Sequence, residues 1–270
     1  MNSFDIIESA SKGYRLVWEE RGYLVKLAAV PFLIKMVCFT AVALLGWEQH
    51  YLRQALVLLP SYFADGWLVA HLVRFIMFEQ RWPFRPTGDT EKDMQVLEDR
   101  ALGVMRGTLM FVVIQFLMAG ITHVAHQSGS AGMSIEGEQA TSLGVFFLAL
   151  AFFIFFFWAF RLVWLYIPAA MNYPIRHFLI DLGGYSASWN LIGTWLLCFL
   201  PAFLILGKLL TVIVGSAESA AAISFETHFL IIFVQVILDI IVSIIATAGM
   251  AYGFINYVLP KTGSKKKSKQ

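Results

Sequence analysis

Long apolar stretches alternate with short polar connections along the whole chain. The six stretches cover residues 23–46, 55–78, 106–124, 143–165, 191–214 and 229–258. A bilayer core of ~30 Å needs about 20 helical residues at ~1.5 Å rise each. Backbone polar groups in lipid must be hydrogen-bonded within their own segment, which favours helices. The pattern therefore predicts an all-α, polytopic bundle of six transmembrane helices.

The composition agrees with this reading of the pattern. Hydrophobic residues make up 59% of the 270, charged residues only 14%, and the mean hydropathy is +0.70. Soluble domains usually contain about 45–50% apolar and about 25% charged residues. One water-soluble core could not bury this excess, so lipid is expected to be the main solvent.

The distribution of lysine and arginine predicts the orientation. Basic residues occur before the first stretch, in the second and fourth connections, and in the C-terminal tail. The first connection has only Arg53, and the connections at 127–141 and 215–228 have none. Because cytoplasmic loops carry the excess of positive charge, both termini are expected in the cytoplasm.

Two further helices are expected outside the spans. Residues 1–22 carry Phe4, Ile7, Tyr14 and Trp18 at helical spacing, which predicts an amphipathic helix at the cytoplasmic interface or, equally, one packed on the end of the bundle. Thr90, three residues before an aspartate, predicts the cap of a helix that continues into the third span. Residues 23–258 would form the membrane domain and 259–270 a disordered basic tail.

A five-residue pattern occurs twice. Glycine-tyrosine, tryptophan, glycine and proline recur with similar spacing at Gly13, Tyr14, Trp18, Gly22 and Pro31 and at Gly184, Tyr185, Trp189, Gly193 and Pro201. Asp65 and Asp239 each follow about eleven residues into the next apolar stretch. This regularity predicts a parallel internal repeat of spans one–two and five–six, with spans three–four between them.

Four ionisable residues lie within the predicted spans, namely Lys35, Asp65, Lys208 and Asp239. A charge at the bilayer centre costs at least ~2.5–3.5 kcal/mol, so these side chains are not expected to face lipid. Lys35 and Asp65 fall at similar depth in adjacent spans and predict an ion pair. Lys208 would pair with Asp239 or extend outward to water. Such groups either bind a substrate or relay protons, or they form structural ion pairs.

A second set of basic residues gathers near the cytoplasmic boundary. It consists of His71, Arg74, Arg106, Arg161 and Arg176. Arginines at head-group depth can contact anionic phospholipid. The alternative is an ordinary positive belt that only fixes the orientation.

Small and aromatic residues predict helix contacts. Gly103 with Gly107, and Gly249 with Gly253, are spaced for close helix approach. The fourth stretch carries seven phenylalanines on every face, at Phe146, Phe147, Phe152, Phe153, Phe155, Phe156 and Phe157. Such a helix would face lipid, a second copy of the chain or a partner membrane protein.

Motifs of soluble chemistry are absent from the sequence. There is no Gly-x-Ser-x-Gly, His-Glu-x-x-His or phosphate-binding loop, and the histidines lack the spacing of a metal site. No enzymatic activity, cofactor, metal or nucleic acid is expected, and membrane lipids are the expected partners.

The lead-in before each proline-bearing span resembles a group of bacterial inner-membrane proteins. The matching residues are Tyr14, Trp18, Gly22 and Pro31, and again Tyr185, Trp189, Gly193 and Pro201. The group includes the YciC-like proteins and the membrane domain fused to some glycerophosphodiester phosphodiesterases. The resemblance implies about six spans in a bacterial inner membrane and no agreed reaction. The leading hypothesis is lipid or amphiphile handling, or support of membrane assembly; the alternatives are a small secondary transporter and a membrane scaffold or accessory subunit.

Overall fold

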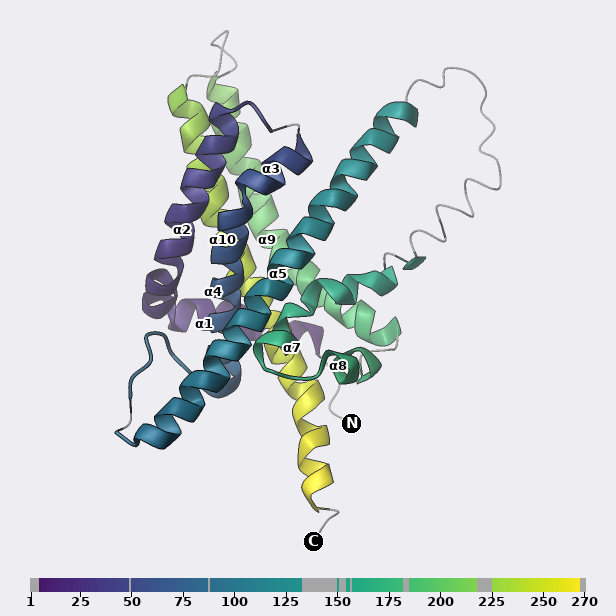
Figure 1. Ribbon diagram of the computed structural model, residues 1–270. Helices are drawn as coiled ribbons and strands as arrows, with labels where there is room; N and C mark the ends of the chain where they lie inside the picture. The colour runs from purple at the N-terminus through teal and green to yellow at the C-terminus, as the bar shows by residue number, and fades with distance from the viewer. Residues whose placement is uncertain are drawn as a thin grey trace.

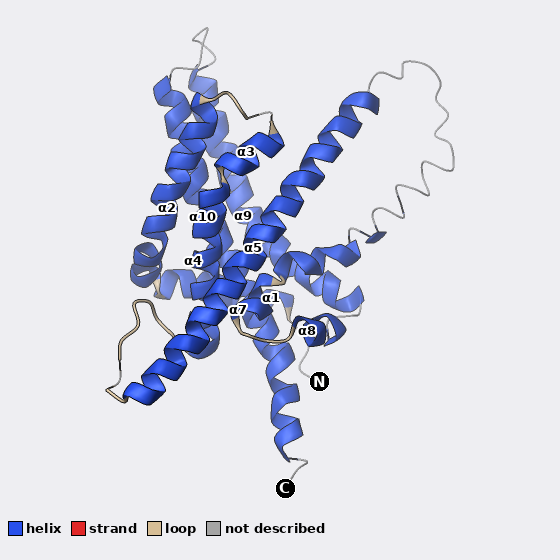
Figure 2. Cartoon of the chain, viewed as in Figure 1, coloured by secondary structure: helices blue, strands red, loops and turns tan. Residues whose placement is uncertain are grey.

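A computed structural model describes residues 5–48, 50–86, 88–132, 150, 154–155, 157–181, 185–217 and 225–267. All regular structure in these ranges is helical, which confirms the all-α class (Figure 2). The elements are α1 (Ile6–Glu19), α2 (Arg21–Leu44), α3 (Tyr51–Val57), α4 (Leu59–Phe78), α5 (Thr90–Gly132), η1 (Phe160–Trp164), α7 (Tyr166–Ala170), α8 (Ile175–Asp181), α9 (Tyr185–Ala217) and α10 (Phe225–Lys267).

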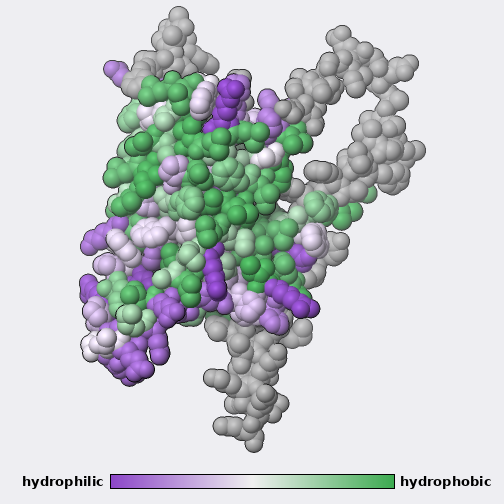
Figure 3. Space-filling view, viewed as in Figure 1, coloured by the Kyte–Doolittle hydropathy of each residue, from purple (hydrophilic) through white to green (hydrophobic). Residues whose placement is uncertain are grey.

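Four of the described helices are long and apolar enough to cross a membrane. They are Arg21–Leu44, Thr90–Val124, Ala187–Leu209 and Glu226–Ile255, and the pair of α3 and α4, bent by 63°, would make a fifth. Hydrophobic surface covers the middle of the visible face, and hydrophilic residues gather where α5 begins (Figure 3). These apolar helices identify a membrane protein.

The fourth predicted span, 143–165, lies mostly outside the described residues. Its described end contains the short 3-10 helix η1, followed by α7. Within the phenylalanine-rich stretch, Phe155 is exposed and Phe157 packs edge-on against Trp189, at 4.6 Å between ring centroids. The other five phenylalanines lie outside the described residues.

Helix α4 lies at the centre of the bundle. Most of its residues are apolar and many are buried, and it contacts α2, α5, α7 and α10 (Figure 1). Its Val69, Ala70 and Val73 join a core cluster with α5, α7, α9 and α10, whereas Leu68 and Leu72 join a second cluster with α1, α2 and α10. Two separate apolar contacts therefore fix the position of this one helix.

The second predicted span, 55–78, is divided by the bend before α4. Pro60 lies in the first turn of α4, where the missing N–H removes no helical hydrogen bond. The 20 residues of α4 are enough for a length of roughly 30 Å. Helices α3 and α4 therefore count together as one bent candidate span, in which α3 packs against α5.

Helix α1 forms as predicted and packs across one end of the bundle against α9 and α10 (Figure 1). Three of the four buried residues of α1 are small, namely Ser9, Ala10 and Gly13. A Cβ atom on Gly13 would lie 2.8 Å from the carbonyl oxygen of Ile245, so α1 and α10 approach closely there. Ile7 and Trp18, each 73% exposed, point away from this contact. The contacts confirm that α1 packs on the bundle. The opposite side of α1 carries exposed apolar residues.

Tyr14 links α1 to the part of α9 where a proline removes one helical hydrogen bond. Pro201 lies inside α9 and has no N–H, so the carbonyl of Leu197 loses its helical partner. The Tyr14 hydroxyl donates to the carbonyl oxygens of Leu197, at 3.0 Å, and Cys198, at 3.1 Å. A side chain from the surface helix thus satisfies the backbone that the proline leaves open.

We expect Tyr14→Phe to lower the free energy of unfolding by about 1 kcal/mol, because it leaves the Leu197 carbonyl without a donor. Thermal unfolding in detergent would measure the loss. The control is Tyr252→Phe, since the Tyr252 hydroxyl forms no hydrogen bond with the described residues. Equal unfolding temperatures for both variants would show that the Tyr14 hydroxyl does not stabilise α9.

The start of α5 differs from the prediction in its capping residue. Asp89, not Thr90, precedes the first turn, and its Oδ1 accepts a hydrogen bond from the Lys92 N–H at 3.4 Å. Asp93 in turn accepts from the Gly88 N–H at 3.2 Å. Asp89 is the stronger acceptor one position earlier, so the helix begins there. The predicted continuation into the third span is confirmed, since α5 runs unbroken to Gly132.

Candidate functional site

Arg74 is a structural centre at one end of the bundle. Its side chain has no exposed surface, and Nη1 donates to the carbonyl oxygen of Ala170 at 3.0 Å. Nε donates to Gln80 Oε1 at 2.9 Å, and Nη2 forms an ion pair with Asp99. Asn172 Nδ2 donates to the same Asp99 carboxylate at 2.8 Å. With every nitrogen engaged, Arg74 ties α4, α5 and α7 together and is not accessible to a lipid head group.

The other predicted lipid contacts do not converge on one site. Arg106 and Arg176 are exposed on α5 and α8, and Arg106 Nη1 donates to Asn172 Oδ1 at 3.3 Å. Arg161 is buried, and its guanidinium lies 4.2 Å from the ring centroid of Trp158. His71 is buried in α4 and faces a different arginine.

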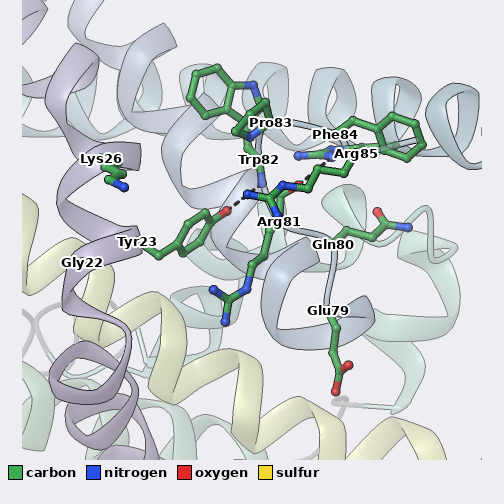
Figure 4. A pocket seen from close by; sticks show the side chains of 11 residues that line it. Gly22, Tyr23, Lys26, Glu79, Gln80, Arg81, Trp82, Pro83, Phe84 and Arg85 are labelled. Atoms are coloured by element: carbon green, nitrogen blue, oxygen red, sulfur yellow. Dashed lines mark hydrogen bonds between the residues drawn. The ribbon is translucent and has the colours of Figure 1, made fainter. Parts of the chain in front are cut away.

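A cavity of about 570 Å³ lies between the α4–α5 loop and α2 (Figure 4). Its charged lining residues are Lys26, Glu79, Arg81, Arg85 and Arg100. Four of these are basic and one is acidic. We call this space the basic cavity.

The loop that forms the basic cavity is held against α2 by specific contacts. The Trp82 N–H donates to the Tyr23 hydroxyl at 3.0 Å (Figure 4), and Arg81 Nη2 lies 2.6 Å from Glu20 Oε1. Arg100 Nη1 donates to the carbonyl oxygen of Arg81 at 3.0 Å. Two of the arginines that line the basic cavity, Arg81 and Arg100, therefore already have partners within the protein.

Two other cations of the basic cavity are available to a ligand. Lys26 and Arg85 are exposed, and neither forms an ion pair or hydrogen bond with any described residue. The two remaining basic residues of the lining, Arg81 and Arg100, add to the positive potential of the basic cavity. Cations without an ion-pair partner beside such residues make a site for a negatively charged group.

A second cavity, of about 490 Å³, lies between α4 and α5, and we call it the apolar cavity. Its α4 wall is the stripe Phe63, Trp67 and His71, spaced four residues apart. Its α5 wall runs from Leu97 to Leu109, roughly 18 Å by helical rise. The α5 wall is therefore long enough to lie beside a hydrocarbon chain.

The two cavities are neighbours. Trp82, Phe84 and Arg100 line both of them. Arg100 is buried at this boundary, with Nη2 3.2 Å from His71 Nδ1, and the Trp82 ring packs edge-on against Trp67 at 5.3 Å. A basic compartment beside a linear apolar one can hold a molecule that is anionic at one end and apolar at the other.

Sequence reasoning missed this site. Arg81, Arg85 and Arg100 entered only as evidence for orientation. One signal was present: the Trp82–Arg85 stretch alternates aromatic residues with proline and arginine in a short loop, where only an orientation marker was expected.

The intramembrane charges meet at one point. Lys35 Nζ lies 2.5 Å from Asp65 Oδ2, which is the predicted ion pair, and it also forms an ion pair with Asp239. Lys208 does not take the Asp239 pairing that was one of its two predicted roles; it is exposed on α9 and forms no ion pair with the described residues. The reason is that α10 packs against α2, which turns Asp239 toward Lys35.

Within the described ranges, no three His, Cys, Asp or Glu side chains come together as metal ligands. The two cysteines, Cys38 and Cys198, are buried free thiols on different helices. The strongest arrangement for a ligand is therefore the pair of adjoining cavities. Comparison of the chain with protein-family models, curated proteins and solved structures finds no match in any of the three.

Proposed function

We propose that this protein binds an anionic amphiphile without transforming it, with the charged head in the basic cavity and one chain in the apolar cavity. The observation that carries the proposal is that Trp82, Phe84 and Arg100 line both spaces. Phosphate and carboxylate head groups fit arginine best, because its planar donors match their oxygens.

The head group supplies the selectivity in this proposal. A hydrocarbon chain that leaves lipid for the apolar cavity exchanges one apolar environment for another, so its burial adds little. An anionic head, by contrast, gains Lys26 and Arg85, which have no ion-pair partner among the described residues. Each basic residue near a membrane surface contributes about 1 kcal/mol toward anionic lipid.

The topology that goes with this function has six spans in a bacterial inner membrane with both termini in the cytoplasm. The positive-inside distribution then puts the basic cavity at the cytoplasmic surface, where anionic lipid head groups are abundant. The internal repeat is supported by two similarities. Trp18 and Trp189 are both exposed, and Pro31 and Pro201 both lie inside long helices.

A second candidate function is transport, which the Lys35 cluster favours. Three helices bring Lys35, Asp65 and Asp239 to one depth. By helical rise, Lys35 and Asp65 each lie roughly 20 Å from the ends of α2 and α4 that face the α4–α5 loop. Ionisable groups at such depth mark substrate or proton pathways in many transporters.

The amphiphile proposal predicts retained lipid. Native mass spectrometry of protein extracted in mild detergent should show an anionic lipid bound to the wild type. Lys26→Ala with Arg85→Ala should reduce its occupancy by roughly tenfold, since two charge-assisted contacts are lost. Both side chains are exposed and unpaired among the described residues, so the fold should not change.

The matched control removes two basic residues from the same end of the bundle but outside the cavity. Arg106→Ala with Arg176→Ala makes the same change in net charge and should leave occupancy unaltered. Equal losses in the two double variants would mean that general surface charge, and not the basic cavity, retains the lipid. Equal retention by all three proteins would contradict the proposal.

A further inference from the structure

A third cavity, of about 210 Å³, lies between α9 and α10 beside the Lys35 cluster. Phe39, Phe199 and Phe203 contribute aromatic rings to its wall, and Asp239 is its charged lining residue. Two of these rings pack on other rings: Phe199 stacks on Trp195, with 4.9 Å between ring centroids, and on Phe203, with 5.6 Å. We call this space the α9–α10 cavity. It shares no lining residue with the basic or apolar cavity.

The charges beside this cavity do not balance. Lys35 is the cation for two carboxylates, Asp65 and Asp239, and in the described part of the chain no other cation contacts either of them. Lys35 and Asp65 are buried, whereas the Asp239 side chain is 55% exposed. With all three groups ionised, the formal charge of the cluster is −1, and its exposed carboxylate, Asp239, lines the cavity.

The depth of Asp239 makes this excess charge costly. It lies fourteen residues after Phe225, roughly 21 Å along α10 from that end. At such a depth the surroundings are hydrocarbon, and an uncompensated carboxylate is strongly disfavoured. A bound cation would remove the imbalance. A small inorganic ion would need several oxygen ligands, and the described lining offers only the Asp239 carboxylate and the Gln235 amide.

We propose that the α9–α10 cavity binds a monovalent organic cation with an apolar body. The carboxylate of Asp239 would pair with the charge, and the three phenyl rings would contact it through their negative faces, as aromatic cages do with quaternary ammonium groups. Phe203 is exposed on the outer side of α9, so the ligand reaches the cavity laterally from the bilayer. This ligand is opposite in charge to the proposed amphiphile and binds independently of it.

Benzyltrimethylammonium is a suitable probe, because neopentylbenzene has the same shape without the charge. Equilibrium dialysis against the full chain in nanodiscs should show saturable binding of the cation that neopentylbenzene does not displace. Asp239→Asn should weaken binding by roughly tenfold or more, since the charged partner is lost. Asp239→Asn keeps the Lys35–Asp65 ion pair, so the bundle retains its charge compensation.

Two further variants separate the cavity from the charge. Ala202→Leu fills the α9–α10 cavity, keeps every charge and should also reduce binding by roughly tenfold. Glu226→Gln removes an exposed carboxylate from the beginning of the same helix α10 and should bind as the wild type does.

Three results would overturn the proposal: no saturable binding to the wild type, equal binding to Asp239→Asn, or equal displacement by neopentylbenzene. Retention of anionic lipid by Asp239→Asn should remain at the wild-type level. Failure of the cation site is therefore distinguishable from failure of the amphiphile site.

Discussion

Lys35→Met is expected to lower the unfolding temperature by on the order of 10 °C. Lys35 forms ion pairs with both Asp65 and Asp239 and is itself buried. Without it, two carboxylates remain close together inside the membrane with no cation between them. Removing one partner of a buried ion pair typically costs ~3–5 kcal/mol, because the remaining charge stays desolvated.

The buried thiols give a direct measurement of this loss. Cys38 and Cys198 are both inaccessible in the folded chain, so a thiol-reactive fluorophore reports unfolding as temperature rises. The control variant combines Lys35→Met with Asp65→Asn and Asp239→Asn, which removes all three charges together. It should recover most of the lost stability. A single Lys35→Met variant that melts with the wild type would show that the cluster does not depend on the lysine charge.

Gly103→Ala is expected to cost roughly 3 kcal/mol of unfolding free energy, although it adds one methyl group. A Cβ atom at this position would overlap Arg74 Nη1 and the carbonyl oxygen of Ala170. The Ala170 oxygen belongs to backbone and cannot turn aside, so α5 must move away from α7. The added methyl would also displace Arg74 Nη1 from its hydrogen bond to Ala170 and leave a buried guanidinium short of a partner.

Gly120→Ala provides the matched control within the same helix. A Cβ atom there meets no atom within 4 Å, so the substitution should be neutral or stabilise α5 by about 0.5–1 kcal/mol through its helix propensity. Thermal unfolding of the two variants side by side measures the difference. Similar melting of both would mean that α5 and α7 do not touch at Gly103.

Features that depend on one helix or on two adjacent helices could be predicted from the sequence. The Lys35–Asp65 pair could be predicted by counting the helical rise along two neighbouring spans. Residues at the same depth in adjacent antiparallel helices lie close together. The close approach at Gly103 and Gly107 followed in the same way, since small residues four apart allow backbones to meet.

Features that depend on which distant segments become neighbours could not be predicted. Asp239 was assigned to Lys208 or to no partner, because sequence does not say that α10 packs on α2. Arg74 was expected either at a lipid head group or in an ordinary positive belt, whereas its partners Ala170 and Asp99 lie 96 and 25 residues away in sequence. The basic cavity likewise exists only because the α4–α5 loop folds back onto Tyr23.

The hydrogen bonds from Tyr14 to the Pro201 turn have a mechanical consequence. Proline is a common point of bending in a helix, and the Tyr14 hydroxyl donates to the carbonyl oxygens that face this point in α9. Ala202 and Phe203, on the wall of the α9–α10 cavity, come immediately after Pro201. The exposed Ile7 and Trp18 of α1 face away from the bundle. We therefore expect a displacement of α1 to change the bend of α9 at Pro201 and, with it, the wall of the cavity.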